Sequence, residues 1–177
     1  MKTLTIALLI FMALGANAQT EGKWSVEVGY SPLIQSGSTF AVYVNRHLSE
    51  KWQIGLMPFG YIYNFSTDYS SFKSNSMGLN FTSRYTLIKG SISKTYIQSF
   101  GGYGRTTNTY QSSNLDESKE DLDFLNFSVG VGVEIAIGKK GWFGDINLGY
   151  LRYYSLSDVN NFNSPIGSIG ILKRFGK

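Results

Sequence analysis

The sequence predicts an all-β protein, an eight-stranded antiparallel up-and-down transmembrane β-barrel. The first observation is a strict alternation over residues 127–138, where large apolar side chains at every second position are separated by small ones. This is the two-residue period of a strand. The second observation is that the small face carries almost no side-chain volume, as expected where it lines a narrow barrel and the bulky face meets lipid. Composition is the third observation, since 15% of the chain is aromatic and only 16% is charged, against about 25% charged in an average soluble domain.

The N-terminal residues have the composition of a secretory signal peptide. Lys2 is followed by an apolar run over 4–14 and an Ala-Asn-Ala stretch, the order of a charged region, an apolar region and a cleavage site. The apolar run is shorter than the roughly 20 residues that span a bilayer as a helix. We therefore expect residues 1–18 to be removed on export and residues 19–177 to form one barrel domain. The alternative is an uncleaved anchor.

Alternation predicts four strands in the first half of the mature chain. They cover residues 24–30, 40–45, 52–65 and 76–87, joined by a turn at 32–38, a short polar connection at 47–51 and a polar loop at 67–75. Pro58 interrupts the third of these strands. Because a proline inside a strand indicates a bulge, we expect a phase change there. It would leave the following aromatic residues on the same face as Trp52, namely Phe59, Tyr61, Tyr63 and Phe65.

Four further strands are predicted in the second half. They cover about 94–106, 127–138, 142–150 and 165–175, joined by a turn at 88–93, a long loop at 107–121, a tight turn at 138–141 and a loop at 155–163. The glycines of the fifth strand leave its phase open. Short turns and longer polar loops thus alternate, which is typical of outer-membrane barrels with short periplasmic turns and longer outer loops.

The two ends of the predicted barrel differ in composition. Trp24, Trp52 and Trp142 all fall at the short-turn end of their strands, which predicts an aromatic girdle at one membrane interface. The alternative is three core tryptophans in a soluble barrel. Acidic residues gather instead around the long loop, at Asp116, Glu117, Glu120, Asp121 and Asp123. They are either solvated or available to a cation or a partner.

Four ionisable side chains share the small-residue phase of their strands. They are Glu27, Arg84, Glu134 and Asp145. Because a lone charge in a narrow lumen is costly, we expect the arginine to pair with the carboxylates. A structural cluster that plugs the lumen is the favoured interpretation, and a gate that opens to ions is the alternative. On the same phase assignment, Gly132→Ser is expected to be far milder than Val131→Arg.

Composition argues against several kinds of chemistry. The chain has no cysteine, one histidine and a formal charge of +4, so we expect no cofactor, no metal site and no nucleic-acid partner. The one catalytic alternative is a pair formed by His47 and Ser49 with Glu50 orienting the imidazole. An ordinary polar turn is the favoured reading of these residues, because neighbours on a turn need not point into one pocket.

The chain resembles the small outer-membrane β-barrel domain proteins of the eight-stranded, OmpA-like and porin-like family. The pattern covers 19–177 and is clearest at 47–56, 127–138 and 167–175. The resemblance implies outer-membrane lipid and the barrel-assembly machinery as partners, with Phe175 in the terminal strand as the assembly signal. Lys173, two residues earlier, departs from the apolar residue usual there.

These observations predict a monomeric barrel in the outer membrane of a Gram-negative cell, exported through a cleaved signal peptide. Its expected role is structural, or an interaction made through the outer loops by an unknown partner, with no catalysis. A narrow pore is the alternative, which an interior filled by side chains disfavours. A secreted soluble barrel that binds a lipid-like ligand is a further alternative.

Overall fold

The computed structural model describes residues 24–33, 37–112, 115–138, 141–156 and 161–175. The predicted signal peptide, residues 1–18, lies outside these ranges. Eight strands follow one another along the chain: β1 (Trp24–Leu33), β2 (Gly37–His47), β3 (Trp52–Ser66), β4 (Ser70–Lys89), β5 (Ser93–Ser112), β6 (Leu115–Ile137), β7 (Trp142–Ser155) and β8 (Phe162–Phe175). Within the described residues, no helix is long and apolar enough to span a membrane.

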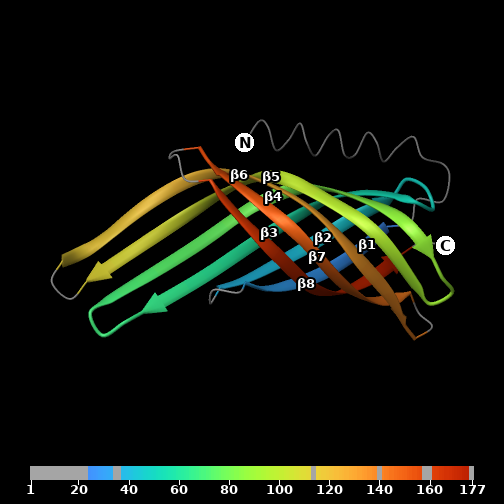
Figure 1. Ribbon diagram of the computed structural model, residues 1–177, viewed down its shortest axis with the longest axis horizontal. Helices are drawn as coiled ribbons and strands as arrows, with labels where there is room; N and C mark the ends of the chain where they lie inside the picture. The colour runs from blue at the N-terminus through green and yellow to red at the C-terminus, as the bar shows by residue number, and fades with distance from the viewer. Residues whose placement is uncertain (1–23, 34–36, 113–114, 139–140, 157–160, 176–177) are drawn as a thin grey trace.

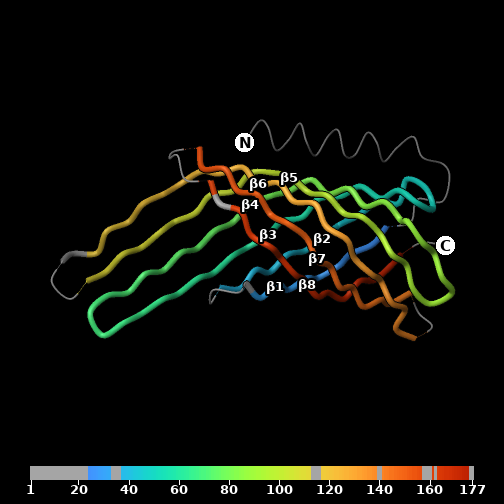
Figure 2. Tube along the Cα trace, viewed as in Figure 1, coloured from blue at the N-terminus to red at the C-terminus, as the bar shows by residue number. Residues whose placement is uncertain are grey.

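The strands form a closed antiparallel barrel in sequence order, and β8 pairs with β1 to complete it (Figures 1 and 2). The predicted up-and-down eight-stranded fold is confirmed. The short turns β2–β3, β4–β5 and β6–β7 meet at one end, which we call the turn end. At the opposite end, the hairpins β3–β4 and β5–β6 reach far beyond the other strands (Figure 1).

Two predicted loops are wrong, because most of each is strand. Residues 70–75 continue β4 and pair with β3 as far as Ser66↔Ser71, while residues 107–112 and 115–121 extend β5 and β6. These segments are rich in Ser, Thr, Asn and acidic residues. Where both faces of a hairpin meet water, there is no apolar alternation to reveal a strand.

The predicted phase change at Pro58 is also wrong. β3 pairs with β4 from Trp52 to Ser66 without a register shift, so Phe59 and Tyr61 face the barrel interior. The proline is accommodated on the other side of β3, where pairing with β2 is interrupted between Ala41↔Phe59 and Val44↔Leu56. A ladder can lose a hydrogen bond at proline without inserting a residue. The register shifts lie elsewhere, in β4 between Thr86 and Ile88 and in β5 between Tyr110 and Ser112.

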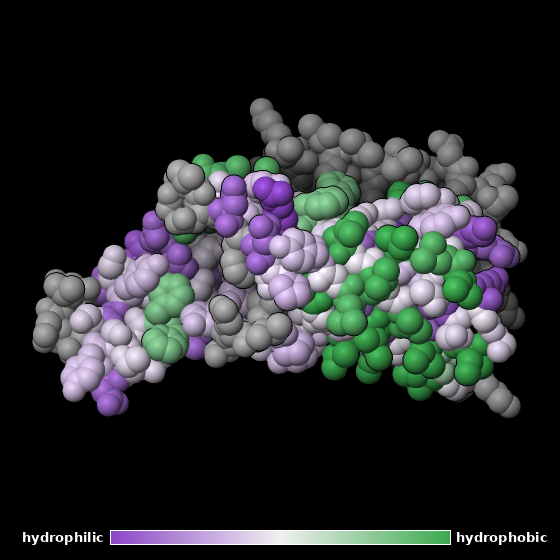
Figure 3. Space-filling view, in the orientation of Figure 1, coloured by the Kyte–Doolittle hydropathy of each residue, from purple (hydrophilic) through white to green (hydrophobic). Residues whose placement is uncertain are grey.

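Side chains divide cleanly between the outside and the inside of the barrel. Val131 is 54% exposed and Leu148 64% exposed, whereas Glu134, in the same strand as Val131, is 1% exposed. The alternation over 127–138 is therefore confirmed. The exposure of the β5 side chains determines the phase of that strand, which the sequence left open: Ile97 faces outward and Tyr96 is buried. On the face shown in Figure 3, the apolar outer residues form a green area on the barrel wall, next to the paler and more hydrophilic projecting hairpins.

The lumen is filled by side chains. Ala41, Tyr43 and Met57 form a buried cluster against which Phe59 and Phe100 pack. Phe124, at the level where β7 ends, stacks on Tyr153 with ring centroids 4.2 Å apart. Small barrels of eight strands are generally packed in this way. The stacked pair of Phe124 and Tyr153 lies between the lumen and the projecting hairpins.

Candidate functional site

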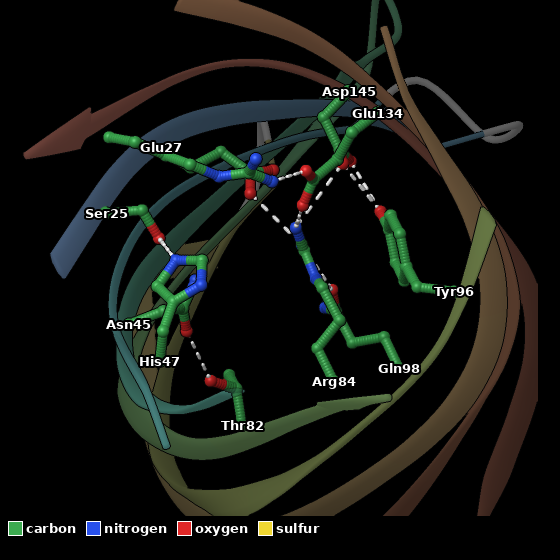
Figure 4. Close-up of polar contacts among 11 residues, drawn as sticks. Ser25, Glu27, Asn45, His47, Thr82, Arg84, Tyr96, Gln98, Glu134 and Asp145 are labelled. Carbon is green, nitrogen blue, oxygen red and sulfur yellow. Dashed lines mark hydrogen bonds and ion pairs between the residues drawn. The ribbon is translucent and has the colours of Figure 1, made fainter. Parts of the chain in front are cut away.

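The four predicted ionisable residues lie together inside the barrel, near the turn end. They come from four strands: Glu27 from β1, Arg84 from β4, Glu134 from β6 and Asp145 from β7. Each side chain is almost completely buried. In Figure 4 the three carboxylates converge on the Arg84 guanidinium from one side, and we call these four residues the lumen ion cluster.

Arg84 contacts every carboxylate of the lumen ion cluster. Its Nη2 lies 3.0 Å from Glu27 Oε2, and its Nη1 lies 2.9 Å from Glu134 Oε1 and 3.4 Å from Asp145 Oδ2. The two remaining guanidinium N–H groups are also used, because Nε and Nη2 donate to Gln98 Oε1 at 2.9 and 2.5 Å. A buried ion pair is tolerated only when the hydrogen-bonding capacity of its members is met in this way.

Besides Gln98, two further residues contact the lumen ion cluster, Tyr96 and Arg174. The Arg84 Cζ lies 4.0 Å from the centre of the Tyr96 ring, and the Tyr96 hydroxyl donates to Asp145 at 2.7 Å. Arg174 donates to the second oxygen of Glu134. Sequence reasoning missed Tyr96 and Gln98 because the phase of β5 was open. It missed Arg174 because that residue sits in a run of basic residues at the chain end.

Tyr96 lies directly over Gly132 of β6. A Cβ at position 132 would collide with the Tyr96 ring and hydroxyl, so a side chain there would displace the group that holds Asp145. This close approach argues against the expectation that Gly132→Ser is far milder than Val131→Arg. The sequence showed that the face is small, but the residue that fills the space comes from the neighbouring strand.

The alternative catalytic residues point to separate partners. His47 ends β2 and its Nε2 lies 3.3 Å from Ser25 Oγ. Ser49 Oγ accepts hydrogen bonds from the backbone N–H groups of Lys51 and Trp52, and Glu50 pairs with Lys89 at 3.1 Å. The arrangement that a nucleophile, a base and an orienting carboxylate require does not form among these three residues.

The three predicted girdle tryptophans lie at the turn end of the wall. Trp52 and Trp142 are about half exposed. Trp24 pairs across the barrel seam with Phe175, the predicted assembly signal. Lys173, the unusual residue of the last strand, places its ammonium 5.0 Å from the centre of the Trp142 ring. This cation–π contact explains how a lysine is accommodated on the outer face at this level.

The projecting hairpins form the second feature with functional potential. β7 ends where Ser155 pairs with Phe124, so β6 continues over residues 115–123 beyond the last residue of β7. On the outer face, Arg105 donates two hydrogen bonds to Asp123, and Tyr103 donates another at 2.6 Å. Together these bonds lower the pKa of Asp123 to about 2. The Asp123 carboxylate therefore stays ionised and paired with Arg105 at the base of the β5–β6 extension.

This closed eight-stranded barrel, with an apolar outer wall and a packed polar lumen, is the fold of small outer-membrane proteins. Among solved structures it is similar to Ail, the attachment invasion locus protein of Yersinia pestis, with a TM-score of 0.62 and 13% identity over 88% of this chain and 100% of that chain.

Two other solved barrels match at similar levels. The N-terminal barrel domain of Pseudomonas aeruginosa OprF has a TM-score of 0.55 at 13% identity, covering 89% of this chain and 100% of that domain. Neisserial surface protein A has a TM-score of 0.56 at 16% identity, covering 86% and 95% of the two chains. No protein-family model matches the sequence, and no curated protein matches it. At these identities the similarity establishes the fold.

Proposed function

We propose that the protein is an outer-membrane barrel with a closed lumen, whose role is to present the β3–β4 and β5–β6 hairpins to the cell exterior for an interaction. The observation that carries this proposal is the length of these hairpins. They continue past the apolar band with polar side chains on their outer face, including Lys73, Thr109 and Lys119. A barrel that served only to fill the membrane would not need them.

The apolar outer surface of the barrel supports the outer-membrane location. Large apolar side chains such as Phe81, Leu148 and Ile169 are more than half exposed. A soluble monomer rarely exposes a continuous apolar surface of this kind, which disfavours a secreted barrel with a lipid-like ligand. Outer-membrane lipid and the barrel-assembly machinery are the partners that this location would require.

Cysteine labelling tests the orientation. The natural chain has no cysteine, so single substitutions give a clean signal. We expect Thr109→Cys, on the β5–β6 hairpin, to react with a membrane-impermeant maleimide in intact cells. Lys51→Cys, at the turn end, should react only after the outer membrane is permeabilised. The reverse pattern would place the hairpins in the periplasm and remove the proposed role.

A narrow pore is the second candidate, and the lumen ion cluster argues against it. Arg84 and its three carboxylate partners lie across the lumen near the turn end, and the buried cluster of Ala41, Tyr43 and Met57 lies farther along it. We therefore expect no steady conductance when the wild-type protein is inserted in a planar bilayer. Sustained single-channel currents from the purified protein would favour the pore.

The separate partners of His47 and Ser49 support a role without catalysis. In the proposed orientation, the turn end that carries them lies on the periplasmic side, away from the outer leaflet. We expect His47→Ala and Ser49→Ala to leave the acylation pattern of lipid A unchanged, as read by mass spectrometry of cells that express each variant. Loss of an acyl chain with the wild-type protein, abolished by either substitution, would instead indicate an enzyme.

A further inference from the structure

The β5–β6 hairpin ends in a strand with one side open. β5 pairs with β6 from Ser93↔Ile135 out to Ser112↔Leu115, whereas pairing of β7 with β6 stops at Phe124↔Ser155. Among the described residues, no strand pairs with β6 beyond Asp123 on the β7 side. An edge of this kind is a template for another strand.

The last contact between β7 and β6 shows which backbone groups face the open side. The N–H of Leu156 donates to the carbonyl of Asp123 at 2.8 Å, so the N–H and C=O of Asp123 point toward β7. These groups alternate direction along an antiparallel strand. The N–H and C=O groups of Asp121 and Lys119 therefore face the open side, while those of Glu120 and Ser118 face β5, as far as the register shift that follows the pair Tyr110↔Ser118.

The side chains of this edge define the chemistry of a partner. Four carboxylates and one ammonium lie between 117 and 123: Glu117, Glu120, Asp121 and Asp123 against Lys119. Lys119 pairs with Glu117 at 2.8 Å, and Asp121 accepts a hydrogen bond from Thr107 at 2.6 Å. Like charges placed opposite each other destabilise a strand pair. A second copy of this edge is therefore a poor partner, and a basic strand is a good one.

We propose that the open edge of β6 over residues 117–122 binds an extended, lysine- or arginine-rich segment of a partner protein, which adds to the projecting sheet as an extra strand. This inference rests on the proposed function, since it needs the hairpin at the cell surface. Backbone hydrogen bonds to the edge would supply affinity, and the carboxylates would select the charge of the segment.

Fluorescence polarisation with the purified, folded barrel in zwitterionic detergent tests the proposal. The probe is a labelled peptide of about nine residues in which lysine alternates with threonine, long enough to cover 117–122 at about 3.3 Å per residue. The control peptide has the same sequence with alternate amides N-methylated, which keeps its charge and removes its ability to pair as a strand. We expect the first peptide to bind and the second to fail.

Two substitutions at one position separate backbone pairing from charge. Lys119→Pro removes an N–H that faces the open side, where proline is tolerated in an edge strand. It also makes the edge more acidic, so binding by charge alone would tighten. We expect it instead to weaken binding about tenfold, since a backbone hydrogen bond is lost and the added strand is disrupted. Lys119→Gln makes the same charge change with the N–H intact, and should bind at least as tightly as wild type.

Removal of the negative charges gives the complementary result. Glu120→Gln and Asp121→Asn should each weaken binding about threefold, because a cross-strand charge pair is lost while the backbone edge remains. Equal binding of both peptides, or tighter binding by Lys119→Pro, would overturn the proposal. If cysteine labelling places the hairpin outside the cell and the peptide still does not bind, the edge inference fails while the proposed function stands.

Discussion

Replacing Arg84 with methionine is expected to destabilise the barrel by about 3–5 kcal/mol, the usual cost of removing one partner from a buried ion pair. The cost arises because Glu27 and Asp145 lose their arginine inside a lumen where neither reaches water. The free energy of unfolding can be read from urea titration of the refolded protein, followed by fluorescence of its tryptophans.

The carboxylates should differ in how well their neutralisation relieves this loss. Glu134 keeps Arg174 as a second partner, whereas every ion pair that involves Glu27 among the described residues is made with Arg84. Glu27→Gln should therefore restore more stability to Arg84→Met than Glu134→Gln does. We expect a coupling free energy of about 1–3 kcal/mol between positions 27 and 84. Additive effects of the two substitutions would show that the observed ion pair is energetically unimportant.

Val131→Arg is expected to cost about 2–4 kcal/mol in a lipid bilayer, because the side chain would face hydrocarbon near the middle of the apolar band. Val131 is exposed on the outer wall and pairs with Leu148 and Ile97, which are also exposed. The same urea titration, made in lipid vesicles, measures the change in free energy of unfolding.

Depth provides the matched control for this substitution. Ile137 is also exposed on β6, but it pairs with the girdle residue Trp142 at the turn end. Ile137→Arg should cost only about 0–1 kcal/mol, since a long cationic side chain near the interface can reach water. If arginine is equally tolerated at 131 and 137, the outer wall does not face lipid.

The sequence predicted the barrel wherever its two faces meet different surroundings. Between Phe127 and Ile137, one face meets the lumen and the other is apolar, so the alternation is visible. Beyond the apolar band, at residues 70–75, 107–112 and 115–121, polar residues predominate without a clear apolar alternation, and the strands were mistaken for loops. Pro58 was misread for a different reason, since one missing hydrogen bond can be absorbed by a gap in pairing as well as by a bulge.

The candidate site was predictable to the same extent. Glu27, Arg84, Glu134 and Asp145 stand out because each is a charged residue among small inward-facing ones. Their contacts with Tyr96, Gln98 and Arg174 depend on the register between strands, which one sequence does not reveal. The open edge of β6 could not be predicted from the sequence for the same reason. It arises because β7 ends at Ser155 while β6 runs on to Leu115, a difference in strand length within a single sheet.

The central claim is that this chain is a folded barrel in the outer membrane, and fractionation combined with gel migration tests it most directly. The protein should sediment with the outer membrane and resist extraction by salt. In a detergent gel, the unheated sample should migrate faster than the boiled sample, because a closed barrel stays compact until heat unfolds it. Recovery in the soluble periplasmic fraction, with identical migration before and after boiling, would contradict the account.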